Sequence, residues 1–325
     1  METHRPVLVY LLAASHSGST LTAMLLNAHS EILSVGELKA TNLGDTTEYL
    51  CSCQSKIRSC RFWERVSVAM QNYNQDFHVY ESLTSLRAIQ SRYVQRLLRP
   101  LHRGRMLEFV RDVLLQFSSV WRRELPLWQK RNRDLVQSVS NLSACRFVVD
   151  SSKIGIRLKY LFQDEDIRIK VIRIVRDGRA VALTYMDPDQ FADASVPSMR
   201  GGGTGRACDH RLSMKRAATE WRRSNEEAEA VIASLPSPDV LQVSYEDLCM
   251  STSKTLDSIH QFLGVSHSEN HKSFKSVVHH VIGNGMRLDQ SSKVVLDERW
   301  REILSKDELT DFEKYAGDLN KKYGY

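Results

Sequence analysis

The chain has 325 residues, of which 42% are hydrophobic, so it has enough apolar material to fill a large core and is neither disordered nor fibrous. Lysine and arginine outnumber aspartate and glutamate by 45 to 39, which gives a net charge of +6. This excess fits an anionic ligand and is too small for a dedicated nucleic-acid binder, so no nucleic-acid partner is expected.

The first apolar run, residues 7–14, is far shorter than the roughly 20 residues of a membrane-spanning helix, and it lacks the flanks of a secretory signal. We therefore expect a buried strand, no transmembrane segment and a cytoplasmic protein. Four further short apolar runs predict strands at residues 32–35, 147–149, 171–175 and 240–243. Because helical stretches separate the runs, the sequence predicts an α/β fold with a mostly parallel sheet and helices on both faces.

A helical insertion is expected between the second and third strands, at about residues 76–139. Between residues 87 and 133, twelve basic residues stand against three acidic ones, an excess of +9. A solvated helix face and a docking surface for an acidic acceptor both fit this excess. Apolar residues recur there every three or four positions, at Met106, Phe109, Val113, Phe117 and Val120.

A loop rich in glycine and proline at about residues 187–211 is expected to be mobile. Helices are predicted at residues 212–233 and 251–264, and a last helix opens with a capping-box pattern at Ser305. No internal repeat divides the chain. We therefore expect a single domain over residues 1–325.

The turn after the first strand has the composition of an anion-binding site. Gly18 permits a tight turn, and the helix-start amides and the hydroxyls of Ser19 and Thr20 supply hydrogen-bond donors. The lysine and the upstream glycine of a nucleoside-triphosphate P-loop are missing, which disfavours that class. A Walker-type site stays open because a strand ending in Asp150 could supply metal binding. An ordinary capped strand-to-helix connection also stays open.

A second anion site is predicted after the fourth strand. Arg176 ends this strand, and Thr184 follows eight residues later, about two turns into a helix. An arginine fork and a hydroxyl at this spacing can bind one phosphate together. Because both anion sites follow parallel strands, they are expected at the same edge of the sheet, where ligands of such sheets bind.

These two sites together resemble the sulfotransferases that use 3′-phosphoadenosine 5′-phosphosulfate (PAPS). In that family a loop reading S-G-T-T or S-G-S-T binds the 5′-phosphosulfate, and residues 17–20 here read S-G-S-T. The family's R-D-P-R strand end, with a serine eight residues after its first arginine, binds the 3′-phosphate. Residues 176–179 read R-D-G-R and are followed by Thr184. Further family counterparts are Gly36-Glu37, the cysteines at 51, 53 and 60 with Phe62-Trp63, and residues 149–153, 244–248 and 283–287.

The resemblance implies a P-loop-like three-layer sandwich and an enzyme that transfers a sulfuryl group in line from PAPS to a hydroxyl or amine, leaving adenosine 3′,5′-bisphosphate (PAP). Glu37 is the expected base. His16 stands where the family usually has lysine or arginine, so it either assists the leaving group or only shapes the loop. The residues expected to bind the nucleotide are Ser15, His16, Ser17, Gly18, Ser19, Thr20, Leu21, Arg176, Thr184, Tyr245, Asn284, Gly285, Met286 and Arg287.

Several other residues have more than one interpretation. Lys153 either reaches the sulfate or lies on the surface, and His29, at the end of the first helix, is expected to be structural rather than a base. Cys51, Cys53 and Cys60 lack the paired spacing and the obvious fourth ligand of a zinc site, so structural cysteines and no metal are expected.

No motif identifies the acceptor, and a small molecule, a lipid alcohol, a carbohydrate and a peptide tyrosine all stay open, as does the oligomeric state. Two other functions also stay open. One is a P-loop kinase that uses ATP and magnesium. The other is a non-enzymatic module that binds acidic polymers through the basic insertion.

Overall fold

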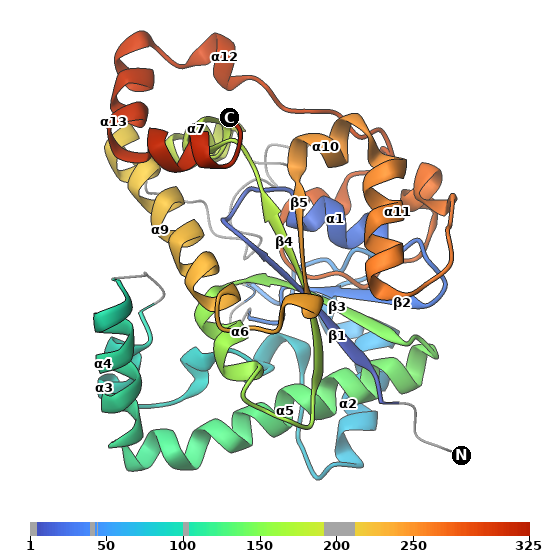
Figure 1. Cartoon of the computed structure of the whole chain (residues 1–325). Helices are drawn as coiled ribbons and strands as arrows, with labels where there is room; N and C mark the ends of the chain where they lie inside the picture. The colour runs from blue at the N-terminus through green and yellow to red at the C-terminus, as the bar shows by residue number, and fades with distance from the viewer. Residues whose placement is uncertain (1–4, 40–42, 44, 100–103, 192–211) are drawn as a thin grey trace.

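The structure, a computed structural model, describes residues 5–39, 43, 45–99, 104–191 and 212–325. Its five strands form one sheet in the order β2-β3-β1-β4-β5, and every pair is parallel (Figure 1). All five predicted strands and the parallel sheet are confirmed. The strands are β1 (Val7–Ala13), β2 (Ile32–Gly36), β3 (Phe147–Lys153), β4 (Arg168–Val175) and β5 (Val240–Ser244).

Strand β1 lies at the centre of the sheet, between β3 and β4, and each of its seven residues is buried. Leu8, Tyr10 and Leu12 pack on one face, against α2 (Arg61–Gln71), α5 (Ser119–Ser143) and α6 (Gly155–Leu161). A strand covered on both faces is apolar along its whole length, which explains the unbroken run in the sequence.

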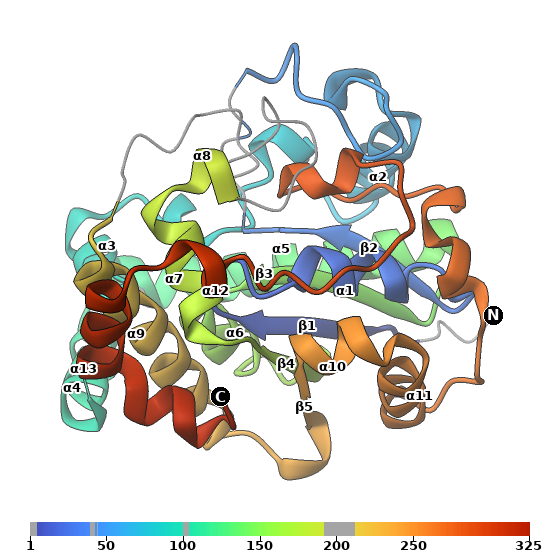
Figure 2. The ribbon, with the colours of Figure 1, turned by 90° about the horizontal axis from the view of Figure 1, so that it is seen from above.

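The opposite face of β1 carries Val7, Val9 and Leu11, which pack against α1 (Ser19–Leu26), α10 (Tyr245–Met250) and α11 (Thr252–Leu263). Helices therefore cover both faces of the sheet, as Figures 1 and 2 show, and the expected three-layer α/β sandwich is confirmed. A third apolar cluster joins α7 (Gly178–Met186), α9 (Met214–Ile232), α12 (Trp300–Ile303) and α13 (Lys306–Lys322).

The insertion is only partly helical as predicted. Its helices are α3 (Arg92–Leu97), α4 (Arg105–Gln116) and α5, whereas residues 76–91 contain only two short 3₁₀ turns. The prediction of α-helix was wrong there because side chains bind the local backbone instead. The Ser85 hydroxyl, for example, accepts from the amide of Arg87 at 3.2 Å.

Helix α4 presents its apolar stripe to solvent. Met106, Phe109 and Phe117 are 80%, 68% and 78% exposed, while Leu115 is buried. The periodicity therefore predicted the helix correctly, but it did not predict that the apolar face of this helix is exposed to solvent.

The later helices agree with the predictions. Helix α11 ends at Gly264 with φ 70°, and α13 opens with a capping box in which Ser305 and Glu308 bond reciprocally. Of the predicted mobile loop at residues 187–211, Pro188–Phe191 forms the short helix α8, and residues 192–211 lie outside the described residues. No helix in the described ranges is long and apolar enough to cross a membrane.

Candidate active site

Residues with polar side chains follow or end all five strands at the carboxyl edge of the sheet. Thr20 follows β1 and Glu37 follows β2. Lys153 ends β3, Arg176 follows β4 and Tyr245 follows β5. Because the strands are all parallel, these residues meet at one edge, at the place predicted for the two anion sites.

The turn between β1 and α1 leaves three backbone donors for a ligand. Gly18 has φ 82°, in the left-handed region, and α1 begins at Ser19. The amide of Thr22 makes the first helical bond, to the Gly18 carbonyl oxygen at 2.9 Å. The amides of Ser19, Thr20 and Leu21 therefore have no acceptor within the helix, and they lie at its positive end, where an anion is favoured.

Three of the predicted residues are packed directly on one another. A Cβ atom at Gly18 would overlap the ring of Tyr245, so the glycine is needed for close approach as well as for its φ. The guanidinium carbon of Arg176 lies 4.3 Å from the centre of the same ring. Arg176 Nη1 also donates to the His16 carbonyl oxygen at 2.7 Å. The two predicted anion sites are thus joined through Tyr245 and His16.

A cavity of about 180 Å³ opens beside this contact. The segment before α12 runs alongside α1 (Figure 2), and its residues 293–295, 297 and 299 line the cavity. The predicted residues on its wall are His16, Gly18, Ser19, Thr20, Leu21, Tyr245, Asn284 and Met286. The wall also contains Lys153, for which a role at the sulfate was open, and five residues that the sequence analysis missed: Lys293, Val294, Val295, Asp297 and Arg299.

Arg176 is not on this wall. Its side chain is 0% exposed and pairs with Asp297 Oδ2 at 3.1 Å. Burial alone would raise the pKa of Asp297, but Arg299 and Arg176 outweigh burial and lower this pKa to about 2. The buried guanidinium therefore holds an ionised carboxylate, which shows that it accepts an oxyanion as a partner.

The remaining predicted ligands also lie off the cavity wall. The Thr184 hydroxyl is buried and donates to the Ala180 carbonyl oxygen at 3.3 Å. Arg287 donates to the carbonyl oxygens of Gly283 at 2.5 Å and Leu50 at 2.8 Å. Ser15, Ser17 and Gly285 are likewise not among the lining residues, so their roles as nucleotide ligands stay predictions.

Glu37 contacts the cavity wall through Lys153 and is held by two lysines. Its Oε1 accepts from Lys153 Nζ at 2.5 Å, and its Oε2 lies 3.4 Å from Lys39 Nζ. Burial alone would raise the pKa of Glu37, but Lys153 and Lys39 outweigh burial and lower this pKa to about 2. Since Lys153 lies on the cavity wall, it connects an ionised carboxylate to the cavity.

Asp150 does not fit the metal-binding role that a kinase would require. It is 0% exposed and pairs with Arg157 Nη1 at 3.1 Å. Its Oδ1 accepts from the amides of Ser152 at 2.9 Å and Leu38 at 3.3 Å. The carboxylate is thus used within the fold, and the kinase alternative loses its metal-binding group.

His29 contributes to the fold, as expected. Its Nδ1 accepts from the amide of Glu31 at 3.1 Å, so its Nε2 carries the hydrogen and donates to the Ser266 carbonyl oxygen at 3.0 Å. Both ring nitrogens are therefore used to tie the end of α1 to a distant loop.

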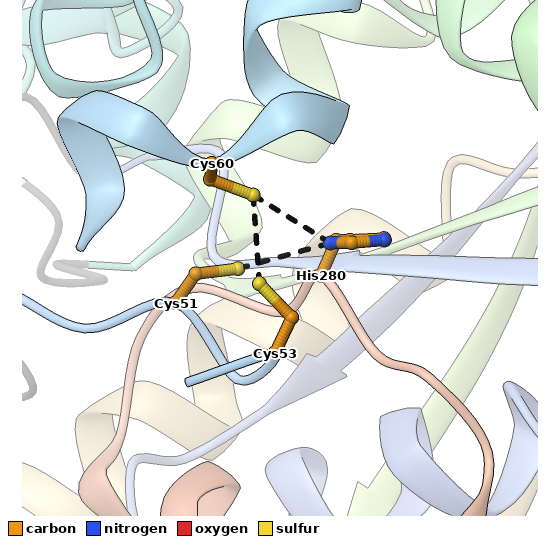
Figure 3. Close-up of side chains that lie close together, drawn as sticks. All are labelled: Cys51, Cys53, Cys60 and His280. Carbon is orange, nitrogen blue, oxygen red and sulfur yellow. Dashed lines mark hydrogen bonds between the residues drawn. The ribbon is translucent and has the colours of Figure 1, made fainter. Parts of the chain in front are cut away.

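The three cysteines do have a fourth partner. Cys51, Cys53 and Cys60 lie around His280, with all four side-chain ligand atoms within 4.8 Å of one another (Figure 3). The expectation that no fourth ligand is available was therefore wrong. The signal was missed because His280 follows Cys60 by 220 residues and belongs to no local motif.

Comparison with known proteins identifies the family to which the chain belongs. The model of the sulfotransferase domain matches residues 8–315 of this chain. No curated protein matches. Because the match spans nearly the whole chain, it includes both anion sites, Glu37, the insertion and the late segment that closes the cavity.

Solved structures are similar in fold at low identity. The sulfotransferase domain from the curacin biosynthetic pathway is 18% identical, with a TM-score of 0.50 and coverage of 97% of both chains. The sulfotransferase domain of the Synechococcus PCC 7002 olefin synthase is 19% identical, with a TM-score of 0.48, and covers 100% of this chain and 97% of that one. Mouse sulfotransferase SULT7A1 complexed with PAP is 11% identical, with a TM-score of 0.43, and covers 99% of this chain and 90% of that one. With the family model matched over residues 8–315, this chain belongs to the sulfotransferase family.

Proposed function

We propose that this sulfotransferase takes its sulfuryl group from PAPS and passes it to a hydroxyl or amine, with Glu37 accepting the acceptor's proton. The observation that carries this proposal is the packing of Gly18, Tyr245 and Arg176, which joins an amide-rich turn to a buried guanidinium at one edge of the sheet. Two linked anion sites match a nucleotide that carries a phosphate group at each end of its ribose.

The turn after β1 fits the 5′-phosphosulfate. The amides of Ser19, Thr20 and Leu21 have no acceptor within α1, and Lys153 adds a cation to the same wall. When bound, PAPS supplies the sulfuryl group and a phosphate leaving group. These donors stabilise the negative charge that grows on the departing phosphate oxygen.

Arg176 fits the 3′-phosphate because it already binds an anion. Asp297 occupies its guanidinium, and the cavity beside it, at about 180 Å³, is smaller than the roughly 300 Å³ or more of a usual ligand pocket. We infer that the nucleotide takes the place of Asp297 and moves the segment at residues 293–299 outward. Tyr245, stacked on Arg176, then presents its ring to the bound nucleotide.

Glu37 fits the base because it is ionised and its surroundings keep it so. Lys153 and Lys39 hold both carboxylate oxygens, which fixes the side chain against Gly283. A carboxylate with so low a pKa is a weak base, so it accepts the proton only as the acceptor oxygen or nitrogen becomes acidic during bond formation to sulfur.

A second cavity, also of about 180 Å³, suits the acceptor. Its wall contains Lys39, which touches Glu37, and it lies between the insertion and the residues that follow β3. The wall combines apolar and cationic side chains, which favours an amphipathic acceptor with an acidic group. Its lining residues are Lys39, Ser85, Leu86, Arg87, Gln95, Leu98, Arg99, Ile154, Ile156 and Arg157.

The donor can be tested by calorimetry with PAP, ATP with magnesium, and heparin. We expect PAP to bind at one site per chain and Gly18→Ala to weaken it, because the added Cβ meets Tyr245. The matched control is Gly264→Ala, which also has positive φ but meets nothing within 4 Å. Gly264→Ala should lose about 1–2 kcal/mol of stability and keep its affinity for PAP, whereas Gly18→Ala should lose more stability, because of the added overlap, and should lose affinity. Tight binding of ATP with magnesium and none of PAP would refute the proposed donor.

The base can be tested with Glu37→Gln. We expect turnover to fall at least 100-fold, in the range that a positioned base contributes, with the affinity for PAP unchanged. The control is Glu48→Gln, which removes a carboxylate that is 70% exposed and pairs with Lys56. Near-normal turnover of Glu37→Gln would remove Glu37 from this role.

The 3′-phosphate site can be tested with Arg176→Lys and Asp297→Asn. Lysine keeps the charge and loses the fork, so we expect PAP affinity to fall about 10-fold or more, the size of one charge-assisted hydrogen bond. Asp297→Asn should raise PAP affinity, because it removes the competing carboxylate. Binding of adenosine 5′-phosphosulfate, which lacks the 3′-phosphate, should change little in both variants. Equal changes for the two nucleotides would contradict the assignment.

A further inference from the structure

Four metal-ligating side chains lie close together outside the candidate active site. Cys51 and Cys53 come from the loop before α2, Cys60 is the N-cap residue of α2, and His280 comes from the segment after the 3₁₀ helix Asn270–Ser276 (Figure 3). Cys53 Sγ lies 3.6 Å from Cys60 Sγ. His280 Nδ1 lies 3.7 Å from Cys60 Sγ and 4.0 Å from Cys51 Sγ.

We propose that Cys51, Cys53, Cys60 and His280 bind one zinc ion. Tetrahedral zinc with bonds of about 2.3 Å to sulfur and 2.0–2.1 Å to nitrogen places its sulfurs about 3.8 Å apart and its sulfur and nitrogen about 3.6 Å apart. The separations of 3.6, 3.7 and 4.0 Å in the structure lie within about 0.4 Å of these values. Three thiolates and one imidazole form a common structural zinc set.

The ligands are held in place before any metal binds. The amide of Cys51 donates to the Ser55 carbonyl oxygen at 2.9 Å, and Leu50 and Lys56 form an antiparallel bridge, so Cys51 and Cys53 lie on a tight turn. On the other side, the ring of Phe62 stacks on His280 with centroids 4.3 Å apart and planes 5° from parallel. This stacking fixes the plane of the imidazole, with Nδ1 toward the sulfurs.

The chemistry of the set favours a closed structural site. Cys51 and Cys60 are 0% exposed, and four protein ligands complete the tetrahedron, which leaves no open position for a substrate. Binding takes the three cysteines as thiolates and His280 as the neutral ring, so the thiol protons pass to solvent. Thiolate and imidazole ligands select zinc over magnesium or calcium, which prefer oxygen.

The zinc would join the turn at residues 49–56 to the late segment that lines the cavity. The turn at residues 49–56 already contacts the segment at residues 280–287 through the Tyr49 hydroxyl, which accepts from the Gly283 amide at 2.9 Å, and through Arg287, which donates to Leu50. That segment continues into Asn284 and Met286 on the cavity wall. The ion therefore closes a loop between residues far apart in the sequence and fixes the late segment beside the sheet.

The experiment is metal analysis of the full chain, produced with zinc supplied and purified without a histidine tag or chelator. We expect about one zinc per chain, and X-ray absorption that shows three sulfurs at about 2.3 Å and one nitrogen at about 2.0–2.1 Å. Absence of zinc, equimolar iron in its place, or a Cys53–Cys60 disulfide in the purified protein would overturn the proposal. These readouts use the unaltered protein and do not depend on how a variant folds.

Variants then test the four ligands. Cys60→Ser and His280→Gln should each lose the zinc, whereas Cys249→Ser, a cysteine outside the cluster, should keep one equivalent. Retention of a full equivalent by both cluster variants would overturn the assignment. The zinc-depleted protein should also bind PAP more weakly, an expectation that rests on the proposed function. A chain that holds zinc and does not bind PAP would refute the proposed donor and leave the zinc site standing.

Discussion

The contact between the Arg176 guanidinium and the Tyr245 ring organises the active-site edge of this sulfotransferase. The two groups lie 4.3 Å apart, and Gly18 packs against the other part of the same ring. Arg176 follows β4, Tyr245 follows β5 and Gly18 follows β1, so one contact sets the relative positions of three strand ends. A side chain at Gly18 would separate them, which explains why the turn requires glycine beyond its backbone angle.

A buried guanidinium needs an anion as counter-ion. The anion for Arg176 comes from the late part of the chain, so this requirement also positions residues 293–299. Asp297 supplies the charge and brings residues 293–299 over α1, where they close the cavity. A buried arginine that loses its counter-ion is strongly destabilising, so Asp297 stabilises the protein. Under the proposed function, the phosphate of the nucleotide displaces this carboxylate. In this proposal the Arg176–Asp297 ion pair stabilises the nucleotide-free protein and keeps the nucleotide site closed.

The sequence predicted the parts of this arrangement that depend on local patterns. Five short apolar runs predicted the strands, and the S-G-S-T turn and Arg176 lie together at the edge of the sheet where the two anion sites were predicted. The missed features depend on distant partners. Asp297 lies 121 residues from Arg176, and His280 lies 220 from Cys60, with no local spacing to signal either. Residues 76–91 were wrongly included in the predicted helix, because the apolar periodicity of the insertion begins only at Met106.

The same late part of the chain meets the site at three points. Residues 280–283 lie along β2, where the Glu37 amide donates to the Ile282 carbonyl oxygen at 3.0 Å and Gly283 leaves room for the Glu37 side chain. Asn284 and Met286 follow on the cavity wall, and Asp297 follows at Arg176. If zinc holds residues 280–283 through His280, the late segment is fixed at that end. Under the proposed function, the nucleotide releases the other end of the segment at Asp297. Removal of the ion would then disturb Glu37 and the cavity wall together, although the cluster lines neither of the two cavities.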